Sequence, residues 1–223
     1  MKPHETPGIG DLERILARRI RAAGLTAPAE ALPRLATHLS LMLKWSRAVN
    51  LTAIVDPDEA IRLHVIESIR AAAHVRPAAG ALLDIGSGNG YPALAIKCVH
   101  PALPATLLEP SIRKSVFIES VVRAAGLEGV SVRRDRIEAP EDLLRFGAIG
   151  NISMRAVAVV ETVIAGAVLA LPAGGRLILL LGGDKAAETL RSLPAGLRSI
   201  ADEPLPGRRD ARLLVLERSS GAA

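Results

Sequence analysis

The chain has 223 residues, enough to bury a sizeable core in one domain with an extension. Hydrophobic residues make up 49% of it but aromatic residues only 2%, so Ala, Val, Leu and Ile must build the core and extensive stacking on single-stranded bases is excluded. The net charge of +5 suits a polyanionic partner without proving one.

The first third of the chain shows the pattern of amphipathic helices. Apolar residues at helical spacing predict one helix from Asp11 to Ala23 and a second from Leu32 to Val49. A third helix is predicted to begin at Asp56-Pro57-Asp58-Glu59, because Asp56 can cap the first turn and Pro57 suits its first position. His64 lies on this helix, where a histidine is either structural or catalytic.

The stretch from Ala81 to Pro92 indicates a ligand site. The apolar run Ala81–Ile85 is typical of a strand buried on both faces, and three alternate glycines follow it, Gly86, Gly88 and Gly90. Glycine allows both a tight turn and close approach of a ligand, and the helix expected at Pro92 offers free N–H groups. We therefore predict a nucleotide-type site, with a ligand-free glycine turn as the alternative.

Two cofactor classes fit this turn. Gly88-x-Gly90-x-x-Ala93 matches the dinucleotide pattern of NAD sites. Asp84-x-Gly86-x-Gly88-x-Gly90 resembles motif I of the class I S-adenosylmethionine (SAM) methyltransferases, in which the acidic position faces the amino-acid end of the cofactor. Glu109, after the apolar run 105–108, can accept both ribose hydroxyls in either class. Because of Asp84 we favour SAM over NAD.

Helices and strands alternate after the glycine turn, which indicates a parallel sheet. The expected elements are a helix at 111–125, strands at 130–132 and 148–153, a helix at 158–171, and strands at 176–181 and 212–216, the last an edge or penultimate strand. The fold class is therefore α/β, a Rossmann-like, mostly parallel sheet of about seven strands. Residues 1–75 are expected to form a helical extension and residues 76–223 the SAM-dependent methyltransferase domain.

Several blocks of residues share the order and spacing of a known family. They are Lys44-Trp45-x-x-Ala48-x-Asn50-Leu51-Thr52, Asp56-Pro57-x-Glu59, His64 with Glu67-Ser68-Ile69, the glycine motif through Pro92, Arg113-Lys114-x-x-Phe117, Arg136-Ile137-Glu138 and Arg155-Ala156. Together they resemble the bacterial ribosomal RNA small-subunit methyltransferase G family, also called glucose-inhibited division protein B. The resemblance implies methyl transfer from SAM to N7 of a guanine in 16S rRNA, with the small ribosomal subunit or its assembly intermediate as partner.

The resemblance also implies roles for individual residues. The cofactor-binding set would be Asp84, Gly86, Ser87, Gly88, Gly90, Tyr91, Glu109, Arg136, Ile137, Glu138 and Arg155, with Ile137 and Glu138 beside the adenine. Arg155 would end the fourth strand at the active site, and Asn50 and His64 would act there from the helical extension. A structural alternative for Arg155 is an ion pair with Glu161 or Glu138.

The residue types agree with this chemistry. N7 of guanine has an exposed lone pair, so it can attack a methyl group without first losing a proton. Such an enzyme needs positioning and electrostatics more than a general base. The sequence has no cysteine placed as a nucleophile for carbon methylation, and no Asn/Asp-Pro-Pro-aromatic motif after the fourth strand for amino methylation.

Three positions depart from the family pattern. Leu181 stands where the family has a lysine, Ala211-Arg212 replaces Arg-His, and Ala93 replaces a glycine. Lys185 is the nearby cation that could replace the missing lysine. The departures leave open a SAM methyltransferase acting on another RNA or a small molecule, and a non-catalytic SAM- or RNA-binding protein.

Cysteine count and hydropathy limit the remaining possibilities. The single cysteine, Cys98, excludes an intramolecular disulfide and a cysteine-based metal site. There is no signal-peptide pattern and no unbroken stretch of 18 apolar residues. We expect a cytoplasmic monomer with no metal and no membrane contact. The cluster Arg133-Arg134-x-Arg136 either contacts RNA phosphates or forms a solvated surface.

Overall fold

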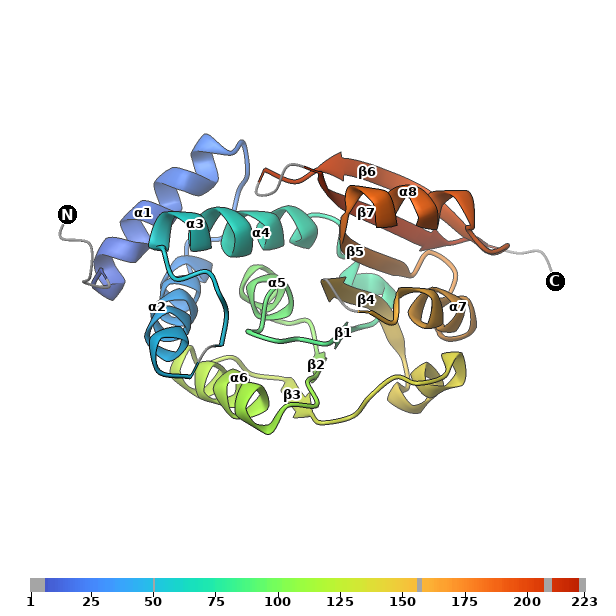
Figure 1. The fold of residues 1–223 in the computed structure, drawn as a ribbon, viewed down its shortest axis with the longest axis horizontal. Helices are drawn as coiled ribbons and strands as arrows, with labels where there is room; N and C mark the ends of the chain where they lie inside the picture. The colour runs from blue at the N-terminus through green and yellow to red at the C-terminus, as the bar shows by residue number, and fades with distance from the viewer. Residues whose placement is uncertain (1–6, 50, 156–157, 207–209, 221–223) are drawn as a thin grey trace.

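A seven-stranded sheet forms the centre of the protein in the computed structural model, which describes residues 7–49, 51–155, 158–206 and 210–220 (Figure 1). The strand order is β3-β2-β1-β4-β5-β7-β6. The strands are β1 (Ala81–Ile85), β2 (Ala105–Leu108), β3 (Val130–Arg133), β4 (Ile149–Arg155), β5 (Arg176–Gly182), β6 (Leu197–Pro204) and β7 (Ala211–Arg218). The first five strands in that order pair in parallel, and β7 runs antiparallel to both β5 and β6. The predicted Rossmann-like, mostly parallel sheet is confirmed.

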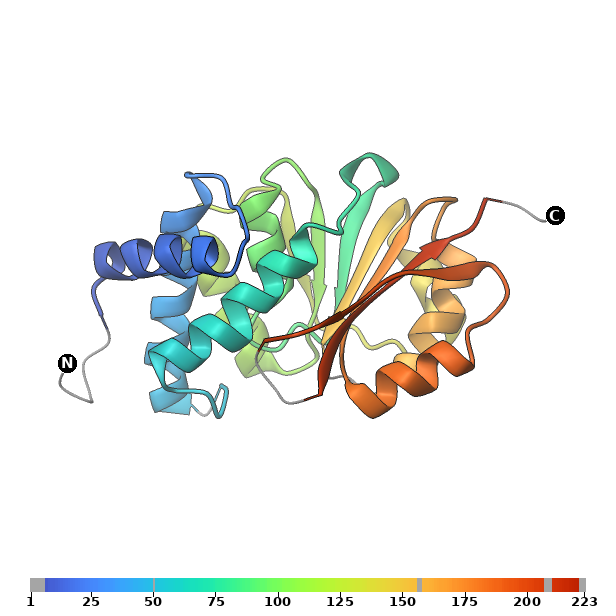
Figure 2. The ribbon, with the colours of Figure 1, turned by 90° about the horizontal axis from the view of Figure 1, so that it is seen from above.

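Helices cover both faces of this sheet (Figure 2). One face carries α1 (Ile9–Ala22), α2 (Ala31–Val49), α3 (Pro57–Ala60), η1 (Ile61–Ile66), α4 (Glu67–Ala72), α5 (Ala93–Val99) and α6 (Ile112–Ala124). The other face carries α7 (Val160–Ala170), α8 (Gly183–Arg191) and the short helix η3 (Pro140–Phe146). A second short helix, η2 (Pro77–Ala79), leads into β1.

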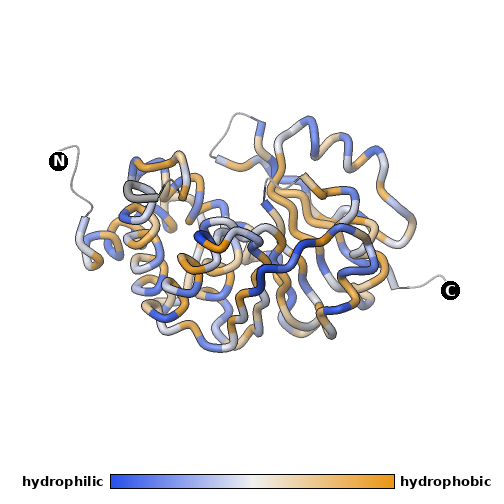
Figure 3. Tube along the Cα trace, turned by 60° about the horizontal axis from the view of Figure 1, so that its bottom comes forward, coloured by the Kyte–Doolittle hydropathy of each residue, from blue (hydrophilic) through white to orange (hydrophobic). Residues whose placement is uncertain are grey.

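Strand β5 shows how the sheet separates two cores. Leu177, Leu179 and Leu181 belong to the core that contains α7, whereas Ile178 and Leu180 belong to the core that contains the N-terminal helices. Successive strand residues point to opposite faces, so a continuous apolar run serves both cores. In Figure 3 the hydrophobic residues accordingly concentrate along the strands between the helical layers.

The N-terminal helices share a core with the sheet. Leu12, Leu16 and Ile20 form the buried stripe of α1 and belong to the same apolar cluster as residues of α5 and α6. Asp56 caps α3 as predicted, since its Oδ1 accepts a hydrogen bond from the Glu59 backbone N–H at 2.8 Å. The extension therefore packs on α5 and α6, which cover one face of the sheet.

Two elements near the C-terminus, α8 and β6, were not expected from the sequence. Most side chains of β6 are half-buried or exposed because it is an edge strand, so it lacks an apolar run. With β6 outside it, β7 occupies the penultimate position, one of the two predicted for it. Among the described residues, no helix combines the length and apolar character needed to cross a membrane.

Candidate active site

The glycine turn between β1 and α5 has the backbone that its sequence predicts. Gly86, Gly88 and Gly90 have φ values of 69°, 57° and 83°, in the left-handed region that side chains with a Cβ rarely adopt. Within the turn the Gly90 N–H donates to the carbonyl of Ser87 at 2.7 Å. A Cβ on Gly88 would meet only the Gly86 carbonyl, at 3.8 Å, so open space lies beside it. The turn therefore exposes bare backbone at the carboxyl end of β1, where α/β sheets bind ligands.

Asp84 lies buried beneath this turn, 1% exposed. Its Oδ1 accepts a 2.5 Å hydrogen bond from Oγ of Ser153, the residue paired with it on β4. Its Oδ2 is buried and has no hydrogen-bond partner among the described residues. Burial raises the pKa of this carboxyl group to about 6, because the charged form loses its water.

Glu109 holds the turn against the end of β2. Its Oε2 accepts a hydrogen bond from the Gly88 N–H at 2.8 Å, and its Oε1 accepts one from the Ser111 N–H at 2.9 Å. Each carboxylate oxygen has a second lone pair, so these contacts leave acceptor capacity for the predicted ribose hydroxyls. Glu109 thus shapes the turn as well as offering a ligand contact.

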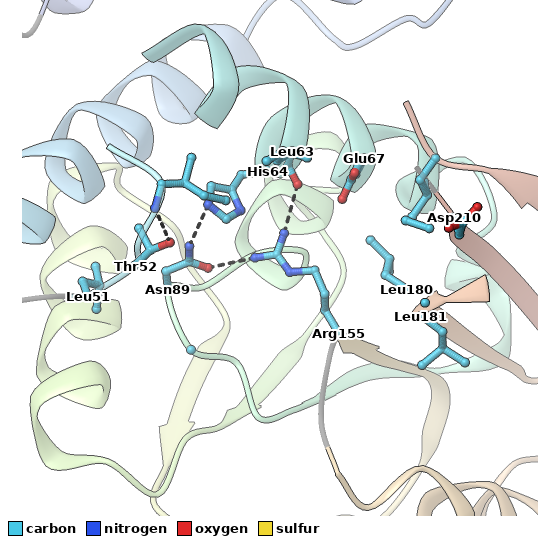
Figure 4. A pocket seen from close by; sticks show the side chains of 15 residues that line it. Leu51, Thr52, Leu63, His64, Glu67, Asn89, Arg155, Leu180, Leu181 and Asp210 are labelled. Atoms are coloured by element: carbon cyan, nitrogen blue, oxygen red, sulfur yellow. Dashed lines mark hydrogen bonds between the residues drawn. The ribbon is translucent and has the colours of Figure 1, made fainter. Parts of the chain in front are cut away.

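A cavity of about 470 Å³ opens beside the turn at the carboxyl ends of β4 and β5 (Figure 4). Its polar wall comprises His64, Glu67, Asn89, Arg155 and Asp210. The remaining lining residues are Leu51, Thr52, Ile54, Leu63, Gly88, Leu180, Leu181, Gly182, Leu205 and Ala211. Its volume lies in the range of small-molecule sites, and its walls come from the extension and from the sheet.

Arg155 reaches into this cavity from the end of β4 (Figure 4). Its Nη1 donates to the backbone carbonyl of Leu63 at 3.2 Å, and its Nη2 donates to Oδ1 of Asn89 at 3.0 Å. Glu161, one of the two acidic residues considered as a structural partner of Arg155, pairs with Lys185. The guanidinium therefore links β4 to the extension and to the glycine turn.

His64 also lines the cavity, from a π-helical turn, η1, within the third predicted helix. Such turns occur frequently at functional sites because they displace side chains from the regular helical stripe. Its Nε2 lies 3.3 Å from Nδ2 of Asn89, so the structure brings His64 and Arg155 to the same side chain.

Tyr91 lies inside the protein, 1% exposed, between two histidine rings. Its ring stacks on His38 at 4.0 Å and on His64 at 5.2 Å, with interplanar angles of 11° in both pairs. The Arg155 guanidinium lies 6.0 Å from its ring centroid. The structure thus gives the Tyr91 ring a packing role, and the implied contact with the cofactor stays a prediction.

The other predicted residues lie apart from the cavity lining. Ile137 is buried in the core on the α7 face, whereas Arg136 and Glu138 are exposed after β3. Asn50 lies outside the described residues. Lys185 does not line the cavity, since its ammonium binds Glu161 and Glu188 on the surface. The hypothesis that Lys185 replaces the missing lysine is therefore not supported by its position.

Three residues that line the cavity were given no role from the sequence: Asn89, Glu67 and Asp210. Asn89 stands inside the glycine motif, where an amide side chain between two glycines is the one signal that could have revealed it. Glu67 and Asp210 are brought to the cavity by the packing of α4 and β7, which sequence spacing does not reveal.

The residues at the glycine turn fit the predicted cofactor. SAM carries an ammonium group, ribose hydroxyls and a sulfonium-bound methyl group. The buried Oδ2 of Asp84 is an acceptor available to the ammonium, and Glu109 has lone pairs for the hydroxyls. The open space beside Gly88 allows a ligand close to the backbone. Among the described residues no group of three His, Cys, Asp or Glu side chains could hold a metal ion.

Comparison with known sequences places the chain among rRNA methyltransferases. Residues 31–200 match the sequence profile of the family described as rRNA small subunit methyltransferase G. The protein of that name from Halorhodospira halophila is 35% identical over 189 residues, covering 85% of this chain and 87% of the relative. The one from Chloroflexus aggregans is 32% identical over 214 residues, covering 93% and 90%.

Solved structures with low sequence identity share the fold. An rRNA methylase from Streptococcus thermophilus has a TM-score of 0.52 at 16% identity, covering 70% of this chain and 95% of that one. A fibrillarin/Nop5p complex gives a TM-score of 0.54 at 14% identity, covering 65% and 74%. These likenesses show that the chain shares their α/β fold.

Proposed function

The chain belongs to the rRNA small subunit methyltransferase G family, and we propose that it methylates N7 of a guanine in 16S rRNA. Membership makes it a SAM-dependent rRNA methyltransferase. We further propose that it acts as a monomer on the small ribosomal subunit or on its assembly intermediate. The observation that carries the proposal is the cavity beside the glycine turn, with Arg155 on its wall.

We propose that Asp84, Glu109 and the backbone at Gly86, Ser87, Gly88 and Gly90 hold the cofactor. The Asp84 carboxylate would accept from the ammonium, and Glu109 would share its lone pairs between the turn and the ribose. Arg136, Ile137 and Glu138 are proposed to lie beside the adenine, and Tyr91 to support the turn. When bound, SAM supplies an electrophilic methyl group.

The cavity is proposed to receive the guanine. Attack by N7 needs no proton removal, so the wall residues have to orient the base and balance the charge that moves during transfer. We assign this role to Arg155, with His64 beside it and Asn50 approaching from the extension. A guanidinium fork can donate to O6 or to a phosphate oxygen in a fixed plane, which a lysine ammonium cannot do.

The division at residue 75 gives each part a role in this proposal. Residues 76–223 form the methyltransferase domain with the glycine turn, and residues 1–75 supply His64, Glu67 and Thr52 to the cavity wall. The extension would therefore close the substrate side of the site, while the sheet holds the cofactor.

The deciding experiment is transfer of tritiated methyl from SAM to purified small subunits, followed by mass mapping of the 16S rRNA. We expect one N7-methylguanine, absent with Arg155→Ala. Labelling of another base or of a small molecule would support a diverged methyltransferase. No transfer to small subunits or to assembly intermediates would indicate a non-catalytic binding protein.

A further inference from the structure

The Asn89 side chain links two polar residues of the cavity wall, Arg155 and His64. It is 6% exposed and lies in the glycine turn. Its Oδ1 accepts from Arg155 Nη2 at 3.0 Å, and its Nδ2 lies 3.3 Å from His64 Nε2 and 3.4 Å from the Met42 sulfur. One amide thus joins β4, η1 and α2 (Figure 4).

The direction of these hydrogen bonds follows from the chemistry of Arg155. A guanidinium only donates, so the group of Asn89 that faces it must be the amide oxygen. The amide NH₂ then faces His64, and a donor on Asn89 requires Nε2 of His64 to be the acceptor. In the neutral imidazole the proton is therefore on Nδ1. The orientation of Arg155 determines the tautomer of His64 through Asn89.

The backbone of Asn89 is held as firmly as its side chain. Nε2 of His38 donates to the Asn89 carbonyl at 2.7 Å. Burial lowers the pKa of His38 to about 4, so this ring stays neutral at physiological pH. At the next residue, a Cβ on Gly90 would lie 2.7 Å from the Leu94 side chain and 3.2 Å from His38 Nε2. The turn therefore has little freedom to move the amide away.

We propose that Asn89 is a positioning residue for methyl transfer. Its amide holds the Arg155 guanidinium and the His64 imidazole in one relative orientation at the cavity wall where the guanine is placed. The role in catalysis rests on the proposed function, whereas the hydrogen-bond link between the two side chains does not.

Several titratable or charged groups surround His64 in the described part of the chain. Arg155, Glu67 and Asp210 line the same cavity. The Tyr91 ring stacks on His64, and the His38 ring stacks on Tyr91. A change made at Asn89 alone leaves all of these in place. A change in the titration of His64 can then be assigned to the amide.

The unmodified protein provides the first test, by ¹⁵N NMR of its histidines with His64→Gln to assign the signal. We expect neutral His64 to carry its proton on Nδ1, with Nε2 unprotonated. A proton on Nε2 would overturn the link, because the Asn89 amide could not then donate to that atom.

Asn89→Asp is the informative variant. The carboxylate still accepts from Arg155. It also accepts from a protonated His64, whereas the amide NH₂ of Asn89 would face the Nε2–H of that ring as a second donor. We expect the NMR titration midpoint of His64 to rise by at least about one pH unit. We expect kcat for methyl transfer to fall at least tenfold, with the Kd for SAM and the KM for small subunits within about threefold, since the amide orients rather than binds.

Asn151→Asp is the matched control. This buried asparagine at the start of β4 donates to the carbonyls of Arg76 and Gly80, each at 3.0 Å, and does not line the cavity. The same chemical change there should lower stability without moving the His64 midpoint.

Each outcome decides one part of the proposal. An unchanged His64 midpoint in Asn89→Asp, or an equal change in Asn151→Asp, refutes the link. A shifted midpoint with unchanged kcat refutes the positioning role. If the unmodified protein methylates nothing, the proposed function fails together with the catalytic role, while the Nδ1–H tautomer still decides the link. The tautomer measurement also serves if Asn89→Asp does not fold.

Discussion

Oγ of Ser153 on β4 donates a 2.5 Å hydrogen bond to Oδ1 of Asp84 on the neighbouring strand β1. The bond joins the two central strands directly under the glycine turn. It satisfies one oxygen of a carboxyl group whose pKa burial raises from 3.8 to about 6. Two measurable consequences follow from this pair, one for stability and one for cofactor binding.

For stability, Asp84 binds its proton more tightly in the folded chain than in the unfolded one. This tighter proton binding stabilises the folded chain below pH 3.8, and the stabilisation is lost as the pH rises through about 6. The difference of roughly 2 pH units corresponds to about 3 kcal/mol. The variant Asp84→Asn has no carboxyl group to ionise at this position. The free energy of unfolding of the variant minus that of the unmodified protein should therefore be larger at pH 7 than at pH 4, by about that amount. Urea unfolding at the two pH values measures this, and a pH-independent difference would contradict it.

For cofactor binding, the ammonium of SAM should favour the ionised form of Asp84. SAM affinity is therefore expected to increase as the pH rises to about 6, the pKa of Asp84, and to level off above it. Calorimetry in two buffers of different ionisation enthalpy should detect proton release near pH 6. With Asp84→Asn the affinity should be lower and nearly independent of pH. NAD should give no binding signal, and tight NAD binding without SAM binding would reverse the cofactor assignment.

The two later glycines of the turn should respond differently to substitution. Gly88→Ala meets no close neighbour but has to adopt a φ of 57°, so we expect a stability loss of about 1–2 kcal/mol. Gly90→Ala adds an approach of 2.7 Å to Leu94, and overpacking of this kind costs about 1–3 kcal/mol more. Gly88→Val should abolish SAM binding by filling the space beside the turn. Melting curves and calorimetry on the three variants test the order, and a Gly90→Ala variant more stable than Gly88→Ala would contradict it.

Arg155→Lys separates charge from geometry at the cavity wall. Lysine keeps the positive charge but cannot donate to both Leu63 and Asn89 in the plane of a guanidinium. We expect the fold to remain, with a stability loss of about 1 kcal/mol for one hydrogen bond. Methyl transfer should fall about tenfold or more, roughly 1.4 kcal/mol of barrier. Unchanged transfer would refute the role assigned to Arg155.

Lys185→Ala should leave methyl transfer within about twofold of the unmodified enzyme. The ammonium of Lys185 is bound to Glu161 and Glu188 on the surface of α7 and α8, and exposed pairs of this kind contribute little to stability because water screens them. A small decrease in melting temperature is therefore the expected effect. A large loss of activity would indicate that Lys185 leaves these carboxylates to enter the site.

Salt dependence tests the arginines at the end of β3, Arg133 and Arg134. Both Arg133 and Arg134 are exposed, but Arg133 already pairs with Asp135 at 2.5 Å and lies over the Phe146 ring. If this surface contacts phosphates, Arg134→Ala should reduce the slope of log K against log salt by about 0.7, and Arg133→Ala by less. Filter binding to a 16S rRNA fragment measures the slopes. A slope near zero in the unmodified protein would favour a small-molecule substrate.

The sequence by itself determined the elements whose signals are local. A buried strand has to be apolar, a left-handed turn requires glycine, and a helix cap needs a short side chain such as that of Asp56. Consecutive residues were therefore enough to predict β1, the turn and α3. The edge strand β6 gave no such signal because exposed positions accept polar residues.

The tertiary structure alone decided which side chains meet across elements. Asn89, Arg155 and His64 are far apart in the chain, and their contact depends on how η1 packs beside the carboxyl end of β4. Other contacts between distant segments bind Lys185 to Glu161 outside the cavity and bury the ring of Tyr91 in the core. Local spacing does not encode such contacts.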